Sequence, residues 1–203
     1  MVTDYRAFGM TVIGASHIKS GSVCQDFSLS CELPDRRISV VCDGHGGADY
    51  FRSDRGSRFA AEAFTECMKD PDVISILSAA ATQKQQSGRI EQLIKSIIAR
   101  WNELVERDIK EHSFGEDELS NISEKARKRY ETGQRLQSAY GTTLIGVILT
   151  ENFWLGLQIG DGKCVAVSKD GEFTQPIPWD EQCFLNVTTS ICDENAAKEF
   201  RFC

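Results

Sequence analysis

Residues 38–47 read ISVVCDGHGG, and the rest of the chain can be organised around this stretch. The branched apolar residues that precede Asp43 predict a short buried strand. Asp43 ends the strand and is followed by a glycine, a histidine and two more glycines. A carboxylate at the end of a buried strand is held rigidly and can still face a ligand. The glycines permit backbone conformations that other residues avoid, and they let another group approach the main chain.

This arrangement suits a hard divalent cation. Asp43 offers an anionic oxygen, the carbonyl of Gly44 offers a second donor, and water completes an octahedron. His45 would then stand beside a metal-bound substrate and could give or take a proton near neutral pH. The alternative interpretation is a tight turn that carries a surface histidine.

A second carboxylate is expected at the same place. Residues 27–32 predict a strand, and residues 34–37 predict a turn into the strand that ends at Asp43. Asp26 begins its strand and Asp43 finishes the antiparallel partner, so a hairpin brings both carboxylates to one edge of a sheet. The sequence therefore predicts a metal site at that edge.

The remaining elements follow the order strands, helices, strands, which predicts an α+β fold of antiparallel sheets with helices packed outside. Hydrophobic periodicity, caps and turn signals predict a strand over 7–16, helices over 48–68, 72–83 and 88–112, a charged connection over 113–137 with a short helix at 123–130, strands over 142–149, 153–159, 163–168 and 173–177, and a helix over 193–200 capped by Ser190 or Asp193. A turn at Asp170-Gly171 is expected to join the last two strands. The Arg-Lys-Arg triplet at 127–129 is interpreted as an exposed helix face.

Composition limits the classes of function. The 203 residues predict a single domain over 1–203, and the net charge of -7 with a pI near 5.1 argues against a nucleic-acid binder. No secretory leader and no stretch long enough to cross a bilayer is found, so a soluble cytoplasmic protein without a membrane partner is expected. The 8 cysteines lack the close spacing of zinc sites and are expected to be free thiols.

A second group of motifs extends the interpretation. Gly160-Asp161-Gly162 places a carboxylate in a predicted hairpin turn, and residues 141–144 read GTTL. Together with Gln25-Asp26 and residues 41–47, this ordered series resembles the metal-dependent protein phosphatases of the 2C type from about residue 12 to residue 203. The resemblance implies a sandwich of two antiparallel β-sheets flanked by α-helices. It also implies hydrolysis of phosphoserine and phosphothreonine in phosphoprotein substrates with two Mg²⁺ or Mn²⁺ ions.

The same resemblance implies a role for each matching residue. Asp43 corresponds to the carboxylate that bridges the two metals, and the carbonyl of Gly44 corresponds to a ligand of one of them. His45 corresponds to the histidine that protonates the departing serine or threonine oxygen. Asp26 corresponds to the acidic residue that orders metal-bound water or binds metal, and Asp161 to the aspartate of a third, weaker metal site. Two cations about 4 Å apart can activate water for in-line attack, so no protein nucleophile is needed.

The chain departs from the family pattern in three places. Gln25 stands where many members have glutamate, which removes one negative charge but leaves an amide oxygen. Residues 12–26 contain no arginine to grip the phosphate; Lys19 or His17 are the candidates for that role. After residue 178 no late Asp-Gly or Asp-Asn metal motif is found, so the expectation is a chain that lacks the last strands and is deficient in one metal site.

Three functions are therefore compared. The first is a metal-dependent protein serine/threonine phosphatase. The second is a non-catalytic phosphatase-like domain that binds or regulates a partner, and the third is an unrelated metal hydrolase acting on diesters or amides. A serine hydrolase is disfavoured because the chain contains no Gly-x-Ser-x-Gly sequence.

Overall fold

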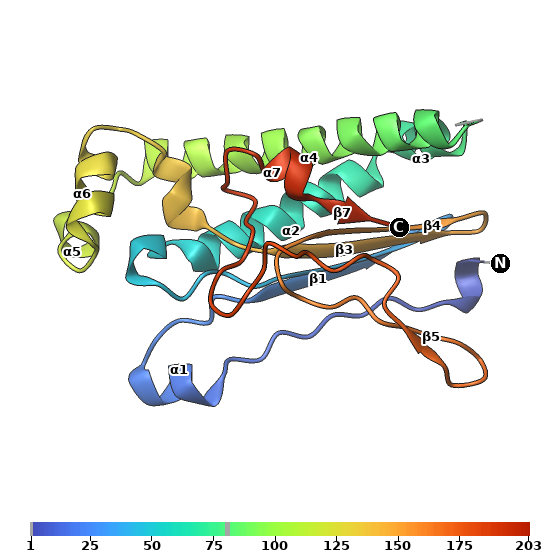
Figure 1. Cartoon of the computed structure of the whole chain (residues 1–203), viewed down its shortest axis with the longest axis horizontal. Coiled ribbons are helices and arrows are strands. Elements are labelled where there is room, and N and C mark those ends of the chain that lie inside the picture. The colour runs from blue at the N-terminus through green and yellow to red at the C-terminus, as the bar shows by residue number, and fades with distance from the viewer. Residues whose placement is uncertain (1, 80–81) are drawn as a thin grey trace.

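A five-stranded antiparallel sheet forms the centre of the α+β fold, in the order β1-β2-β3-β4-β7 (Figure 1). The computed structural model describes residues 2–79 and 82–203. The strands are β1 (Phe27–Glu32), β2 (Arg36–Cys42), β3 (Leu144–Thr150), β4 (Trp154–Ile159) and β7 (Arg201–Phe202). The α+β class and the antiparallel sheet are thus confirmed.

The register of the first hairpin confirms the expected meeting of the two carboxylates. Phe27 of β1 lies opposite Cys42 of β2, so Asp26 and Asp43 lie next to each other at the end of the pair. On its other side β2 pairs with β3, where Val41 faces Ile145. The end of β2, which leads into Asp43, is therefore held between β1 and β3.

Helices cover one face of this sheet (Figure 1). They are α2 (Ser53–Lys69), α3 (Pro71–Ser78) and α4 (Gln83–Glu111). Alternate residues of β2 and β3, such as Ile38 and Ile148, are fully buried against them. Phe64 of α2 packs so closely on Gly146 that a Cβ there would lie 2.4 Å from the ring, so this position needs glycine. Burial of these apolar side chains is the main stabilising contribution to the fold.

The opposite face of the sheet carries the N-terminal segment, the helix α1 (Ala15–Ser20) and a second, small antiparallel sheet. This second sheet consists of β5 (Ala166–Val167) and β6 (Phe173–Thr174). Ser168 and Gly171 close the connection between them, and Gly171 has a φ of 84°, which favours glycine. The predicted turn at Asp170-Gly171 is confirmed, but both strands are shorter than expected.

The predicted strand over residues 7–16 is wrong. This segment attaches to β1 through side chains, with Ala7 N donating to Glu32 Oε1 and Thr11 Oγ1 within 2.7 Å of Ser28 Oγ, and not through a backbone ladder. Its end forms α1, which Gly21 terminates with a φ of 71° and a hydrogen bond to Ile18 O. Alternation of apolar residues alone could not distinguish an added strand from a segment held by its side chains.

The helix predictions are correct in place and approximate in length. Helix α3 ends at Ser78, and residues 80–81 of the predicted 72–83 helix lie outside the described residues. The last helix, α7 (Ala196–Glu199), is shorter than the predicted 193–200. The predicted cap is wrong, because α7 follows Asn195 and Asp193 Oδ2 instead accepts a hydrogen bond from Ser190 N.

The other helical segments are short: η1 (Val2–Asp4), η2 (Ala48–Tyr50), α5 (Glu116–Leu119), α6 (Glu124–Glu131) and η3 (Leu136–Tyr140). Within residues 2–79 and 82–203, none of the helices combines the length and apolar character needed to cross a bilayer. All eight cysteines are free thiols, as expected.

Candidate active site

Asp26 and Asp43 form a pair of carboxyl groups close enough to share a hydrogen bond. Partial burial, followed by the charge of Asp26, raises the pKa of Asp43 to about 6, and Asp161 adds to the effect. Both side chains reach solvent, and in the described part of the chain neither forms an ion pair with a lysine or arginine. A close pair of like charges requires a proton or a cation between its members.

The Gly-Thr-Thr motif holds the backbone of Asp43 on both sides. Asp43 N donates to Thr143 Oγ1 at 3.1 Å, while Asp43 O accepts from Thr142 Oγ1 and from Thr143 N, both at 2.9 Å. Both threonines are buried. The motif therefore positions the carboxylate from across the sheet, a role that its residue types did not reveal.

Gly44 fills a place that no other residue could occupy. A Cβ on Gly44 would lie 2.5 Å from Gln25 O and 2.7 Å from Ser53 O. The amide of Gly44 donates to Gln25 O at 3.2 Å. Gly44 thus joins the chain before β1, the end of β2 and the start of α2 in one tight contact.

His45 is fixed through both its backbone and its ring. His45 N donates to Gly141 O at 3.0 Å, and the ring meets Tyr50 edge-on with centroids 4.8 Å apart. A Cβ on Gly141 would lie 2.6 Å from His45 Cδ2, so the ring also needs this glycine. Burial lowers the pKa of His45, and the charges of Asp193 and Asp161 partly oppose this shift. The imidazole is therefore mainly neutral at pH 7.

Gln25 supports the His45 turn. Its Nε2 donates to His45 O at 3.1 Å and to Ser53 Oγ at 2.9 Å, and Ser53 Oγ itself donates to the same carbonyl at 2.8 Å. The side-chain amide is thus engaged with the main chain of the turn. An amide can donate two such hydrogen bonds, which a carboxylate in its place could not.

The structure brings Asp161 to the same site and places Lys19, the candidate for holding the phosphate, on α1. Asp161 is exposed, accepts a hydrogen bond from Thr188 Oγ1 at 3.3 Å, and its charge acts on Asp43 and His45. Lys19 lies exposed on α1, and no ion pair or hydrogen bond of its side chain is found within residues 2–79 and 82–203. His17, the other candidate on α1, is close enough for its charge to lower the pKa of Asp43.

Asp193 is a site residue that sequence analysis missed. Its carboxylate closes the turn that begins at Ser190. Burial lowers the pKa of His45 and raises that of Tyr50; the charge of Asp193 opposes the first shift and adds to the second. Ser190 Oγ in turn donates to Thr142 O at 3.0 Å. No local motif marks Asp193, because its place depends on how the segment after residue 178 returns to the sheet.

The donor set fits a hard divalent cation. Mg²⁺ is commonly held by one or two carboxylates while it keeps several waters, and the unneutralised pair Asp26–Asp43 supplies such carboxylates. Among the residues that the structure describes, no group of three or more His, Cys, Asp or Glu side chains converges on a single position. The protein donors present therefore suit a largely hydrated ion.

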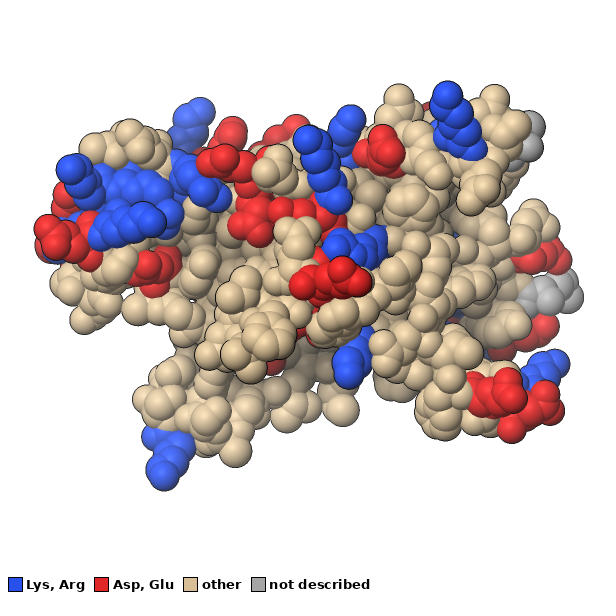
Figure 2. Space-filling model, viewed as in Figure 1, with Lys and Arg blue, Asp and Glu red and all other residues tan. Residues whose placement is uncertain are grey.

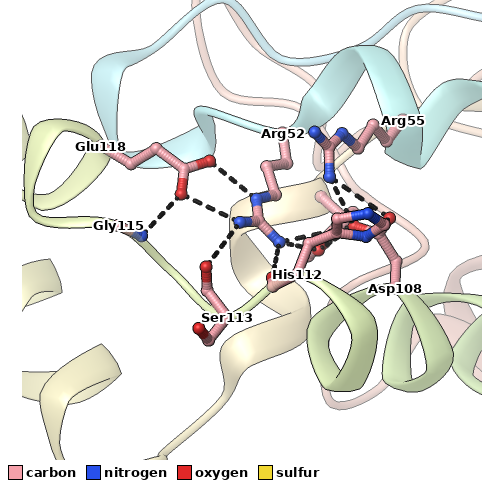
Figure 3. Close-up of polar contacts among 8 residues, drawn as sticks. Arg52, Arg55, Asp108, His112, Ser113, Gly115 and Glu118 are labelled. Atoms are coloured by element: carbon pink, nitrogen blue, oxygen red, sulfur yellow. Dashed lines mark hydrogen bonds and ion pairs between the residues drawn. The ribbon is translucent and has the colours of Figure 1, made fainter.

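A buried arginine, Arg52, ends the turn that carries His45, and Figure 3 shows its polar contacts. Arg52 lies directly before α2. Its guanidinium donates to both carboxylate oxygens of Glu118, at 2.7 and 2.9 Å. It also donates to His112 O at 2.7 Å and to Tyr140 Oη at 2.8 Å. Its own amide donates to Ala139 O. Arg52 thus joins the turn to the end of α4 and to η3.

Comparison with known proteins identifies one family. The sequence model of the protein phosphatase 2C family matches residues 13–203. This range includes Asp26, Asp43, His45, Asp161 and the Gly-Thr-Thr motif. No curated protein matches the chain.

Proposed function

Since the chain belongs to the protein phosphatase 2C family, we propose that this phosphatase acts on phosphoserine and phosphothreonine of protein substrates with Mg²⁺ or Mn²⁺. The observation that carries the proposal is the carboxyl pair of Asp26 and Asp43 beside a positioned imidazole, His45. We further propose that the chain forms a single domain. One hydrophobic cluster that runs from Ile38 to Phe200 supports this view.

Asp43 is the principal metal ligand in this proposal, with Asp26 beside it and the carbonyl of Gly44 as a further donor. Asp161 would hold a third, weaker ion. Bound divalent ions polarise phosphoryl oxygens and lower the pKa of water. The buried threonines that fix the Asp43 backbone support this role, because a ligand that cannot shift holds its oxygens in a constant geometry.

His45 donates a proton to the departing serine or threonine oxygen. Its neutral form prevails at pH 7 because burial lowers its pKa, while Asp193 and Asp161 favour the imidazolium form. The proton donor is thus a minority species that the two carboxylates help to supply. A substrate whose leaving group is stable as an anion does not need this proton donor.

Replacing His45 with glutamine is therefore expected to affect substrates unequally. Turnover of a phosphothreonine peptide should fall about 100-fold or more, because its alkoxide is a poor leaving group. Turnover of p-nitrophenyl phosphate should fall far less, because p-nitrophenolate leaves readily. Steady-state kinetics on both substrates check this, and an equal loss on both would contradict the role of His45 as proton donor.

A manganese-dependent assay tests the function itself. The protein is expected to hydrolyse p-nitrophenyl phosphate and a phosphothreonine peptide with Mn²⁺ and not with EDTA, and Asp43→Asn should remove this activity. Lys169→Ala, which changes an exposed residue of the β5–β6 connection, serves as the control. Phosphopeptide binding without any turnover would instead indicate a non-catalytic domain. Turnover in EDTA would contradict metal dependence.

A further inference from the structure

Basic side chains gather over α6 although the chain as a whole carries a net charge of -7. Figure 2 shows lysine and arginine side chains concentrated at the end of the molecule where Figure 1 places α6. Lys125, Lys128 and Arg129 are spaced by three and four residues, which puts them on one face of the helix. We call these three residues the α6 basic face.

The α6 basic face is not neutralised within the part of the chain that the structure describes. Lys125 and Lys128 are exposed and make no ion pair there. Their neighbour Arg127 does, with Glu116 at 2.5 Å and Glu131 at 2.8 Å. Glu116 and Glu131 are thus paired with Arg127, and the charges of Lys125 and Lys128 remain available for a ligand.

Arg129 uses only part of its guanidinium within the protein. Its guanidinium lies over the ring of Tyr130 at 4.9 Å, and its Nη2 donates to Tyr130 Oη at 3.1 Å. Its Nε is buried and has no hydrogen-bond partner among the described residues. Its Nη1 makes no hydrogen bond or ion pair among the described residues, so this end of the guanidinium can bind a carboxylate.

Two contacts connect this face to His45. Tyr130 Oη donates to Asp49 O at 2.9 Å, and the next residue, Tyr50, packs its ring against the ring of His45. The charge of Arg129 acts on Tyr50. An extended peptide advances about 3.3 Å per residue, so residues a few places from one bound at His45 can reach α6.

We propose that the α6 basic face binds acidic residues that flank the phosphorylated serine or threonine of the substrate protein, an inference that rests on the proposed phosphatase function. The face recognises the surroundings of the phosphate and not the reacting phosphate, because Asp49 and Tyr50 lie between α6 and His45. Three unpaired cations suit a short acidic peptide. A lipid surface is typically bound by clusters of four to eight, and an acidic protein repels nucleic acid.

A binding experiment tests the proposal without turnover. Two labelled phosphothreonine peptides, one with aspartates and one with asparagines around the phosphothreonine, are titrated in EDTA and followed by fluorescence anisotropy. Wild-type protein should prefer the acidic peptide, and the preference should shrink at high salt. Lys125→Ala/Lys128→Ala should weaken binding of the acidic peptide about 3- to 10-fold and leave the neutral peptide within about twofold.

The control variant is Lys84→Ala/Lys95→Ala, which removes two exposed lysines of α4, and it should leave both affinities unchanged. Equal affinity for the two peptides, or an equal loss with both lysine pairs, would overturn the proposal. So would binding to phosphatidylserine vesicles that needs Lys125 and Lys128 without any preference between the peptides. Because EDTA removes the metal, a lysine-dependent acidic preference supports the docking face even if the manganese assay shows no turnover.

Discussion

Asp43→Asn is expected to stabilise the metal-free protein at pH 7 while it removes metal-dependent activity. In the folded chain, burial and the charge of Asp26 raise the pKa of Asp43 from 3.8 to about 6. A raised carboxyl pKa means that the stability contributed by the neutral acid is fully present below pH 3.8 and is lost as the pH rises through about 6. Ionised Asp43 therefore destabilises the fold at pH 7, and asparagine does not.

The expected gain is modest because Asp43 reaches solvent. A shift of about two units corresponds to roughly 3 kcal/mol, and discounting for solvent screening leaves about 1 kcal/mol. Urea unfolding in EDTA at pH 7 measures it, and the difference from wild type should fade near pH 4. A loss of stability at pH 7, or a gain that persists at acid pH, would contradict the origin assigned to the raised pKa.

Mn²⁺ should reverse the order of stability. A ligand that binds only the folded state raises the free energy of unfolding according to its affinity. Wild-type protein should therefore gain stability with Mn²⁺, whereas Asp43→Asn should gain little and lose at least about 100-fold in phosphatase activity. Asp170→Asn is the matched control, because Asp170 is an exposed aspartate of the β5–β6 connection and is not one of the proposed ligands; it should keep the gain with Mn²⁺. The same stabilisation by Mn²⁺ in wild type and Asp43→Asn would show that Asp43 is not a ligand.

Features that depend on neighbouring residues could be predicted from the sequence. The hairpin that joins Asp26 to Asp43 follows from two strands and a short turn, since antiparallel pairing leaves little freedom in register. The long apolar stripe of α4 was recognisable for the same reason, because Ile94, Ile97 and Trp101 recur at helical spacing and are fully buried. Each pattern repeats within a few residues.

Features that depend on distant segments could not be predicted. Thr142 holds the Asp43 carbonyl from 99 positions along the chain, and neither residue carries a local signal of the other. Asp193 was interpreted as a helix cap, because an acidic residue before a possible helix usually has that role. In the structure the Ser190 turn returns to the Gly-Thr-Thr motif and brings Asp193 near His45.

Arg52→Ala is expected to lower the free energy of unfolding by about 3–5 kcal/mol, because it breaks a buried ion cluster and leaves acidic partners unpaired. Arg52 is 3% exposed, and it contacts Glu118 and Asp108. Burial alone would raise the pKa of both acids. Hydrogen bonds from Tyr140 and Arg55 lower the pKa of Asp108 below its usual value, and a hydrogen bond from Arg52 does the same for Glu118. Urea unfolding at pH 7 measures the loss.

Arg55→Ala separates this effect from a general loss of positive charge. Arg55 binds the same acid, at 3.0 Å from Asp108 Oδ2, but its side chain is 41% exposed. Solvent-exposed pairs contribute about 0–1 kcal/mol, so this variant should unfold almost like wild type. If Arg52→Ala also lowered the free energy of unfolding by only about 0–1 kcal/mol, water would be screening the whole cluster.

A double variant shows whether the unpaired acid causes the loss. In Arg52→Met/Glu118→Gln the charges of the closest pair are removed together, while methionine retains much of the packing against Phe114, whose ring lies 4.7 Å from the guanidinium carbon. The double variant should therefore be more stable than Arg52→Met alone. With Glu118→Gln measured as the other single variant, the cycle should give a coupling energy of about 0.5–3 kcal/mol. Strict additivity would mean that Arg52 acts through packing alone. Coupling would mean that the fold tolerates a buried charge here because the guanidinium binds Asp108 of α4, Glu118 of α5 and Tyr140 of η3 from one position, and so fixes the turn that carries His45.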